Sequence, residues 1–232
     1  TRHSSLVTRH SSLVTRHSLV QYQIPTTADT YQTLSASAQA EYKDKGSRFI
    51  AYAQPSSSTE QVAEQLAELR RQHPKCTHIC YAYRLGTDGS SFRAQDDGEP
   101  SGTAGKPILG QIDSLELTNT LVAVVRYYGG TNLGVSGLKN AYKAAAKAAL
   151  LLAPRVEKSI ETLLEVVYPY ALTSALMQIL HKAPYARIHS HEPNAYAPLA
   201  CVLVAVRKNS APALVAALQE IPDLQTQIIS EL

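Results

Sequence analysis

Cysteines are few, long apolar runs are missing, and no catalytic signature is present; each absence excludes a class of protein. The 232 residues contain three cysteines, Cys76, Cys80 and Cys201, and no secretory signal is visible. We therefore expect a protein of the reducing cytoplasm without a disulfide framework. No segment approaches the roughly 18 consecutive apolar residues of a membrane span. The G-x-S-x-G, H-E-x-x-H and protein-kinase signatures are absent, so the sequence offers no convincing nucleophile.

Surplus basic charge is also missing once the first twenty residues are set aside. They read TRHSSLV, TRHSSLV and TRHSLV, without a methionine at the start. Such a repeat indicates an artificial, misread or disordered segment outside the fold, and a native basic arm is the alternative. The repeat holds three of the 22 basic residues and no acid, so 19 basic groups face 19 acidic groups in residues 21–232. Nucleic-acid binding would thus depend on local clustering of charge.

The remaining chain is globular in composition, with 44% apolar and 18% charged residues. Ser58 and Gln61 suggest a capping box for a helix that ends at about Gln72. Ser136 is expected to cap a second long helix, which ends at about Leu152. Residues 31–43, 47–54, 76–85 and 91–95 are expected to form strands, of which 76–85 alternates between two faces. A helix is expected over 103–114. The apolar run in 117–128 barely alternates, which predicts a strand buried on both faces.

The second part of the chain has a different order of elements. Strands are expected over 159–169, 186–192, 199–207 and 224–230, and helices over 170–182 and 211–221, the second capped by Ser210. This β-α-β-β-α-β order is typical of a ferredoxin-like α+β sandwich. We therefore predict an α+β protein of two domains, residues 21–155 and 156–232.

A glycine-rich stretch, VVRYYGGTNLGVSGLKNAY, occupies residues 124–142. Gly129, Gly130, Gly134 and Gly137 permit close approach or a positive φ between a buried strand and a helix N-terminus. Backbone N–H groups at such a junction can face an anion. The spacing matches neither a Walker A loop nor G-x-G-x-x-G. A tight turn without chemistry is the alternative.

Basic residues follow the glycines at helical spacing. Lys139, Lys143 and Lys147 recur every four residues and so share one helix face. No acid lies between Arg126 and Lys147, and such a density of one sign attracts phosphate. Tyr127 and Tyr128 can offer a stacking face to a base. The alternative is a solvated helix face with the tyrosines in the core.

An acidic loop, DDGEPSGTAGKP, covers residues 96–107. Its carboxylates, Asp96, Asp97 and Glu99, suit a helix N-terminus near Thr103 and can accept bonds from the backbone or from Arg126. We favour this structural role, with a pair between Arg126 and Asp97 or Glu99. Binding of Mg²⁺ and direct contact with a partner are the alternatives.

Cys76, His78 and Cys80 are expected on one face of a strand. Side chains two residues apart on a strand are about 7 Å apart, too far for a Cys-His nucleophilic pair. A C-x₃-C strand is also a poor zinc site, because zinc ligands usually come from turns. We assign no metal and no cofactor.

The acidic loop and the glycine-rich stretch together closely resemble the IMPACT/YigZ protein family, and the resemblance covers roughly residues 28–232. His78 and Cys80 also match the family pattern, which implies a structural or site role for them. The matching residues are Asp96, Asp97, Gly98, Glu99, Pro100, Gly102, Thr103, Ala104, Gly105, Lys106, Pro107, Arg126, Tyr127, Tyr128, Gly129, Gly130, Leu133, Gly134, Gly137, Leu138 and Tyr142.

The resemblance implies a fold and a setting for the function. The N-terminal domain is expected to resemble the second domain of a small-subunit ribosomal protein and domain IV of elongation factor G. The C-terminal domain is expected to resemble domain V of that factor. Eukaryotic relatives modulate the stress kinase that phosphorylates a translation initiation factor, by competing for its activator. Bacterial members have been suggested to bind nucleic acid or ribosomes.

The sequence therefore favours a non-enzymatic cytoplasmic protein that binds RNA or the ribosome and modulates translation or its stress regulation. The predicted contact residues are Arg126, Tyr127, Tyr128, Gly129, Gly130, Gly134, Lys139 and Lys143. One alternative is a Mg²⁺-dependent enzyme that uses a phosphate or nucleotide, with Asp97 or Glu99 as metal ligand. Another is a protein-interaction module in translation control. The oligomeric state is not predicted.

Overall fold

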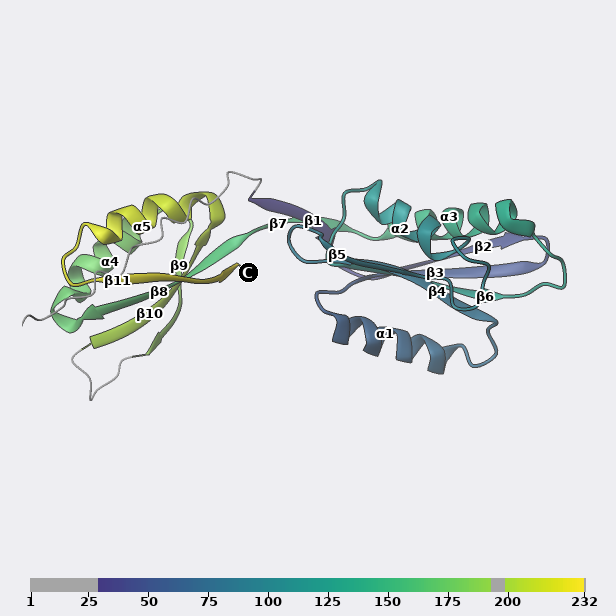
Figure 1. Cartoon of the computed structure of the whole chain (residues 1–232), viewed down its shortest axis with the longest axis horizontal. Helices are drawn as coiled ribbons and strands as arrows, with labels where there is room; N and C mark the ends of the chain where they lie inside the picture. The colour runs from purple at the N-terminus through teal and green to yellow at the C-terminus, as the bar shows by residue number, and fades with distance from the viewer. Residues whose placement is uncertain (1–28, 193–198, 232) are drawn as a thin grey trace, which may run out of the picture.

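The computed structural model describes residues 29–192 and 199–231, so the repeat at residues 1–20 lies outside the described part of the chain. The described residues form two lobes joined by a short ribbon (Figure 1). Both lobes mix helices with antiparallel sheets, which confirms the α+β prediction at the level of architecture. The likeness to a ribosomal protein and to elongation factor G stays a prediction.

The first lobe is a five-stranded sheet in the order β2-β3-β6-β4-β5, with every neighbouring pair antiparallel. The strands are β2 (Ala38–Asp44), β3 (Ser47–Pro55), β4 (His78–Leu85), β5 (Ser91–Gln95) and β6 (Thr120–Tyr127). Helix α1 (Thr59–Gln72) covers one face of the sheet, and α2 (Gly105–Asp113) and α3 (Gly134–Leu152) cover the other (Figure 1). The central strand β6 is therefore buried on both faces, as predicted.

The helix starts in this lobe differ in how well the sequence predicted them. At α1, Ser58 Oγ accepts a hydrogen bond from Gln61 N at 3.2 Å, so the predicted cap is present. The Gln61 side chain accepts from the N–H of Ser57 at 2.8 Å, one residue before the N–H expected in a capping box. At α3, the prediction that Ser136 caps the helix is wrong. Leu133, three residues earlier, is the N-cap residue and makes no side-chain cap bond, and Gly134, with φ +73°, turns the chain into the helix.

A two-stranded ribbon joins the lobes, and the sequence did not reveal it. The predicted strand at 31–43 is in fact two strands, β1 (Thr30–Leu34) and β2, separated at residues 35–37. Strand β1 leaves the five-stranded sheet and pairs antiparallel with β7 (Arg155–Ser159). Ser35 N donates to Pro154 O at 2.9 Å, which fixes the break between β1 and β2. The predicted domain boundary at 155/156 falls within β7 and stays a prediction.

The second lobe has the predicted β-α-β-β-α-β order. Its sheet order is β11-β8-β10-β9, all antiparallel, and α4 and α5 cover one face (Figure 1). Ser210 occupies the N-cap position of α5, but its side chain makes no cap bond. The elements are β8 (Glu161–Pro169), α4 (Thr173–Lys182), β9 (Ala186–Glu192), β10 (Leu199–Arg207), α5 (Ala211–Gln219) and β11 (Gln225–Glu231), with short 3₁₀ turns at Tyr170–Leu172 and Lys208–Ser210.

Candidate functional site

The two motifs meet inside the first lobe, on the side of the sheet that α2 and α3 cover. Arg126, at the end of β6, donates through Nη1 to Glu99 Oε1 of the acidic loop at 2.5 Å. Tyr142 of α3 donates its hydroxyl to the same oxygen at 2.8 Å. Both charged side chains are buried, with 7% and 3% of their surface exposed. The predicted pair between Arg126 and Glu99 is therefore confirmed.

Strand β4 adds two more side chains to this cluster. His78 Nδ1 lies 2.6 Å from the carbonyl oxygen of Asp97, which can only accept, so Nδ1 carries a proton and Nε2 faces Glu99 Oε1 at 4.0 Å. Cys80 Sγ lies 3.0 Å from Asp96 O and 3.2 Å from the Tyr142 hydroxyl oxygen. We call Cys80, His78, Glu99, Arg126 and Tyr142 the buried polar cluster.

The chemistry of the buried polar cluster is that of a scaffold. Burial raises the pKa of the Cys80 thiol to about 12 and also raises the pKa of the Tyr142 hydroxyl. Both groups are therefore protonated near neutral pH, where a thiol without a thiolate form is a poor nucleophile. The side chains connect two strands, β4 and β6, with the acidic loop and with α3.

Asp96 organises the start of α2. Its Oδ1 accepts from the backbone N–H groups of Ala104 at 2.9 Å and Gly105 at 2.8 Å, and its Oδ2 accepts from Gly102 N at 2.7 Å. Burial on its own raises the pKa of Asp96, but these backbone donors outweigh burial and hold the pKa below its ordinary value. The carboxylate thus remains ionised at the helix N-terminus, where the helix dipole favours negative charge.

Asp97 joins the start of β4 to α1. Its Oδ2 accepts from the backbone N–H of Ile79 at 2.7 Å, and its Oδ1 pairs with Arg70 of α1 at 3.1 Å. Asp96, Asp97 and Glu99 therefore serve three different sets of donors. Across residues 29–192 and 199–231, no three His, Cys, Asp or Glu side chains are grouped as ligands of a metal ion.

The rest of the acidic loop is held by a hydrogen bond within the loop and by its backbone conformation. Thr103 is buried and donates its hydroxyl to Pro100 O at 2.7 Å. Gly102 adopts φ +71°, a conformation that side chains disfavour. Pro107 lies in the first turn of α2, where a missing N–H leaves no bond unmade, and Lys106 beside it is exposed.

The glycines of the turn between β6 and α3 are required by geometry. A Cβ on Gly129 would lie 1.9 Å from the carbonyl carbon of Gly46, in the turn between β2 and β3. Gly130 and Gly134 have open space around them but adopt φ +85° and +73°. Each of these glycines therefore has a structural reason that is independent of any ligand.

Tyr127 and Tyr128 lie on opposite faces of the sheet, so the two rings do not form one surface, and stacking of a base on either ring stays a prediction. The Tyr127 hydroxyl lies 2.8 Å from His73 Nδ1, on the side that α1 covers. Tyr128 remains 47% exposed on the other side, and the guanidinium carbon of Arg126 is 5.5 Å from its ring centre. Consecutive residues of a strand point to opposite faces, which explains the separation.

Lys139, Lys143 and Lys147 are all exposed along α3, as predicted; we call them the lysine row. Leu138, Ala141, Tyr142 and Ala145 fill the opposite, buried face of the helix. In the described part of the chain, none of the three lysines is in an ion pair. Their charges are therefore not neutralised by neighbouring acids.

Cys76 does not share a face with His78 and Cys80, contrary to the prediction. Strand β4 begins only at His78, and Cys76 lies in the preceding turn, where its N–H donates to His73 O at 3.1 Å. Cys76 packs with Leu69 and Ile79 on the α1 side, whereas Cys80 belongs to the core on the α3 side.

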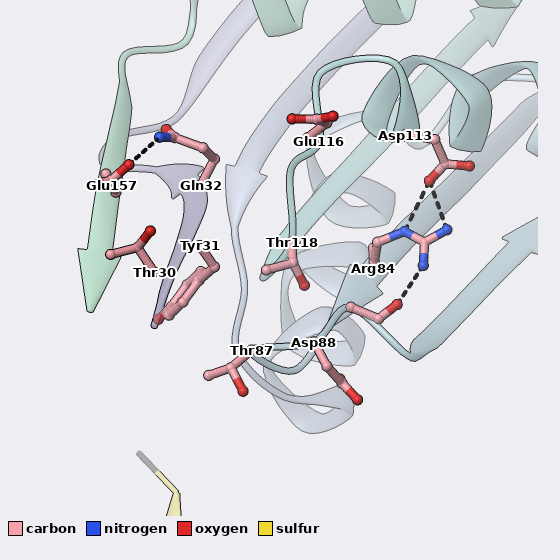
Figure 2. A pocket seen from close by; sticks show the side chains of 11 residues that line it. Thr30, Tyr31, Gln32, Arg84, Thr87, Asp88, Asp113, Glu116, Thr118 and Glu157 are labelled. Carbon is pink, nitrogen blue, oxygen red and sulfur yellow. Dashed lines mark hydrogen bonds and ion pairs between the residues drawn. The ribbon is translucent and has the colours of Figure 1, made fainter. Parts of the chain in front are cut away.

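A cleft of about 570 Å³ lies elsewhere, where the ribbon meets the first lobe (Figure 2). Arg84 pairs with Asp113 at 2.8 Å, and Gln32 donates to Glu157 at 3.2 Å. Sequence reasoning missed this cleft, because its lining comes from separate segments without a shared motif. The lining residues are Thr30, Tyr31, Gln32, Arg84, Thr87, Asp88, Gly89, Asp113, Glu116, Thr118 and Glu157. With four acids and one arginine, it is poorly suited to phosphate.

The fold and the site define a two-lobed α+β protein in which two sequence motifs build a buried polar cluster below a basic helix. Residues 45–150 match the family model described as the Impact N-terminal domain. An IMPACT family member of Haemophilus influenzae is 34% identical over 166 residues, which is 71% of this chain and 76% of the relative. The chain belongs to the IMPACT family.

A further relative and a solved structure are also similar to this chain. The IMPACT family member YigZ of Escherichia coli is 39% identical over 108 residues, covering 46% of this chain and 53% of the relative. A solved structure described as that of an hypothetical protein aligns with a TM-score of 0.68 and 27% identity, covering 88% of this chain and 99% of that one. The match to the solved structure thus extends over both lobes.

Proposed function

We propose that this protein is a non-enzymatic cytoplasmic factor that binds RNA or the ribosome through the lysine row and the adjacent turn, and so modulates translation or its stress regulation. The observation that carries the proposal is the lysine row itself, three exposed lysines on one helix face without neutralising acids. Unpaired basic groups at helical spacing attract a phosphate backbone by releasing its counterions. The role in translation is brought to this chain from its family.

The carboxylates of the acidic loop favour binding over catalysis. Asp96 is occupied by three backbone donors, Asp97 by Ile79 N and Arg70, and Glu99 by Arg126 and Tyr142. A Mg²⁺-dependent enzyme would need these oxygens for the metal. In this proposal the three carboxylates stabilise the loop and strand ends that support the RNA-binding surface.

Affinity for RNA and for ribosomes, measured over a salt series, tests the proposal. Residues 21–232 are used, because Arg2, Arg9 and Arg16 of the repeat would attract polyanions on their own. We expect affinity to fall steeply as salt rises. The double variant Lys139→Glu/Lys143→Glu should bind about tenfold more weakly or worse, with the slope of log affinity against log salt reduced by about 1.5.

A matched control separates the site from net charge. Lys158→Glu/Lys182→Glu changes the charge equally, on exposed lysines of the ribbon and of α4. The control should retain affinity. If both double variants weaken binding equally, the lysine row is not the site. If neither RNA nor ribosomes bind at low salt, a protein partner becomes the better hypothesis.

A further inference from the structure

Tyr128 is an exposed aromatic side chain in the turn before α3, the helix that carries the lysine row, and three contacts fix its position. Its backbone N–H donates to Thr77 Oγ1 at 3.1 Å. Its hydroxyl donates to Asn132 Oδ1 at 3.2 Å, across the turn that leads into α3. The ring is therefore held at both ends while 47% of the residue faces solvent.

Arg126 supports the ring from below. Its guanidinium carbon lies 5.5 Å from the centre of the Tyr128 ring and 5.4 Å from that of the buried Phe49 ring. The guanidinium is fixed in turn by Glu99 at 2.5 Å. A buried arginine held in this way makes a rigid cation–π support, so the ring loses little freedom when a ligand stacks on it.

From this geometry we infer that Tyr128 is a stacking platform for an unpaired base, so that the surface prefers single-stranded RNA to a duplex. The inference rests on the proposed function and narrows it to a class of ligand. In a duplex the bases are stacked on each other and unavailable to an outside ring, whereas in single strands they can be splayed onto aromatic side chains. The lysine row, which starts five residues into α3, would hold the backbone of the same strand.

The experiment measures affinity for a single-stranded RNA of about 12 nucleotides without self-complementarity, and for the duplex that it forms with its complement. Fluorescence anisotropy gives both affinities, and an aminopurine base within the strand reports stacking by loss of its fluorescence. We expect Tyr128→Leu to weaken single-strand binding about tenfold and to abolish the fluorescence loss, with duplex binding unchanged. Tyr128→Phe retains the ring and should retain both properties.

Phe92→Leu is the matched control, since Phe92 of β5 is 57% exposed and has Arg84 5.1 Å from its ring centre. It should behave as the unmodified protein. RNA binding without single-strand preference, or binding that Tyr128→Leu leaves unchanged, would overturn the stacking role while the proposed function stands. Absence of binding to both RNAs would overturn the stacking role, and absence of ribosome binding as well would overturn the proposed function. Thermal unfolding of each variant confirms that the first lobe is intact.

Discussion

The buried pair between Arg126 and Glu99 gives the most direct test of how the two motifs depend on each other. We predict that Glu99→Gln, which keeps the shape of the side chain and removes its charge, lowers the free energy of unfolding of the first lobe by about 3–5 kcal/mol. Arg126 would then be a buried cation without a counterion. The second lobe should be unaffected, because its core is a separate hydrophobic cluster.

The size of the effect follows from the burial and geometry of the pair. Only 7% of the Arg126 side chain and 3% of the Glu99 side chain are exposed, so water cannot solvate the guanidinium that is left without its counterion. The guanidinium lies against the ring of Phe49, which is fully buried, and Arg126 Nε is buried without a hydrogen-bond partner. A loss of 3 kcal/mol corresponds to a fall in melting temperature on the order of 10 °C for a lobe of this size.

Urea unfolding followed by circular dichroism measures the change, with tyrosine fluorescence as a second probe. Glu161→Gln is the control: Glu161 pairs with Arg187 at 2.6 Å on the surface of the second lobe, where solvent screens the interaction, so its removal should hardly shift the transition. Replacing both partners, as Glu99→Gln with Arg126→Met, should recover part of the loss, because no charge then remains buried. A loss below about 1 kcal/mol for Glu99→Gln would refute the reasoning.

Two further predictions concern the turn and the acidic loop. Gly129→Ala should destabilise the first lobe by about 3 kcal/mol or more in urea unfolding, because its Cβ would lie 1.9 Å from the Gly46 backbone. Gly130→Ala has no atom within 4 Å of its Cβ and only the strain of φ +85°, so it should lose only about 1–2 kcal/mol. The pKa of Asp96 is lower in the folded state than in the unfolded state, so its stabilisation is present above about pH 4 and is lost as pH falls through the folded pKa. Asp96→Asn should therefore flatten the acid limb of stability measured by urea unfolding from pH 6 to pH 2, and an unchanged acid limb would count against this role.

The sequence predicted those features that depend on local periodicity or on a charge pair with few alternatives. The apolar run of β6, the exposed lysines of α3 and the helix in residues 59–72 all follow from spacing along one element. The pair between Arg126 and Glu99 followed from an arginine at the end of a buried strand and a short loop of acids. Between the two motifs, sequence reasoning therefore reached one contact, as one of two stated alternatives.

Features that depend on non-local pairing were out of reach. Strands β1 and β7 are separated by more than one hundred residues, so no local pattern shows that they pair; β1 was predicted only as part of one strand over 31–43, and β7, which is short and largely exposed, was not predicted. The start of α3 was misplaced because the positive φ of Gly134 replaces a side-chain cap. The separation of Tyr127 from Tyr128, in contrast, was predictable, since adjacent residues of a strand alternate between faces.

The two motifs form one structural unit in which few side chains are left to contact a ligand. Most of their side chains are used up internally: Asp96 caps α2, Asp97 joins β4 to α1, Glu99 neutralises Arg126, and the glycines allow the turn to pass Gly46. The side chains that these contacts leave at the surface include the ring of Tyr128 and the lysines of α3. Substitutions of Asp96, Asp97 or Gly129 should therefore reduce RNA binding only by unfolding the first lobe, whereas substitutions of Tyr128, Lys139 and Lys143 should reduce binding while the lobe stays folded. Measuring stability and affinity on the same variants separates these two groups.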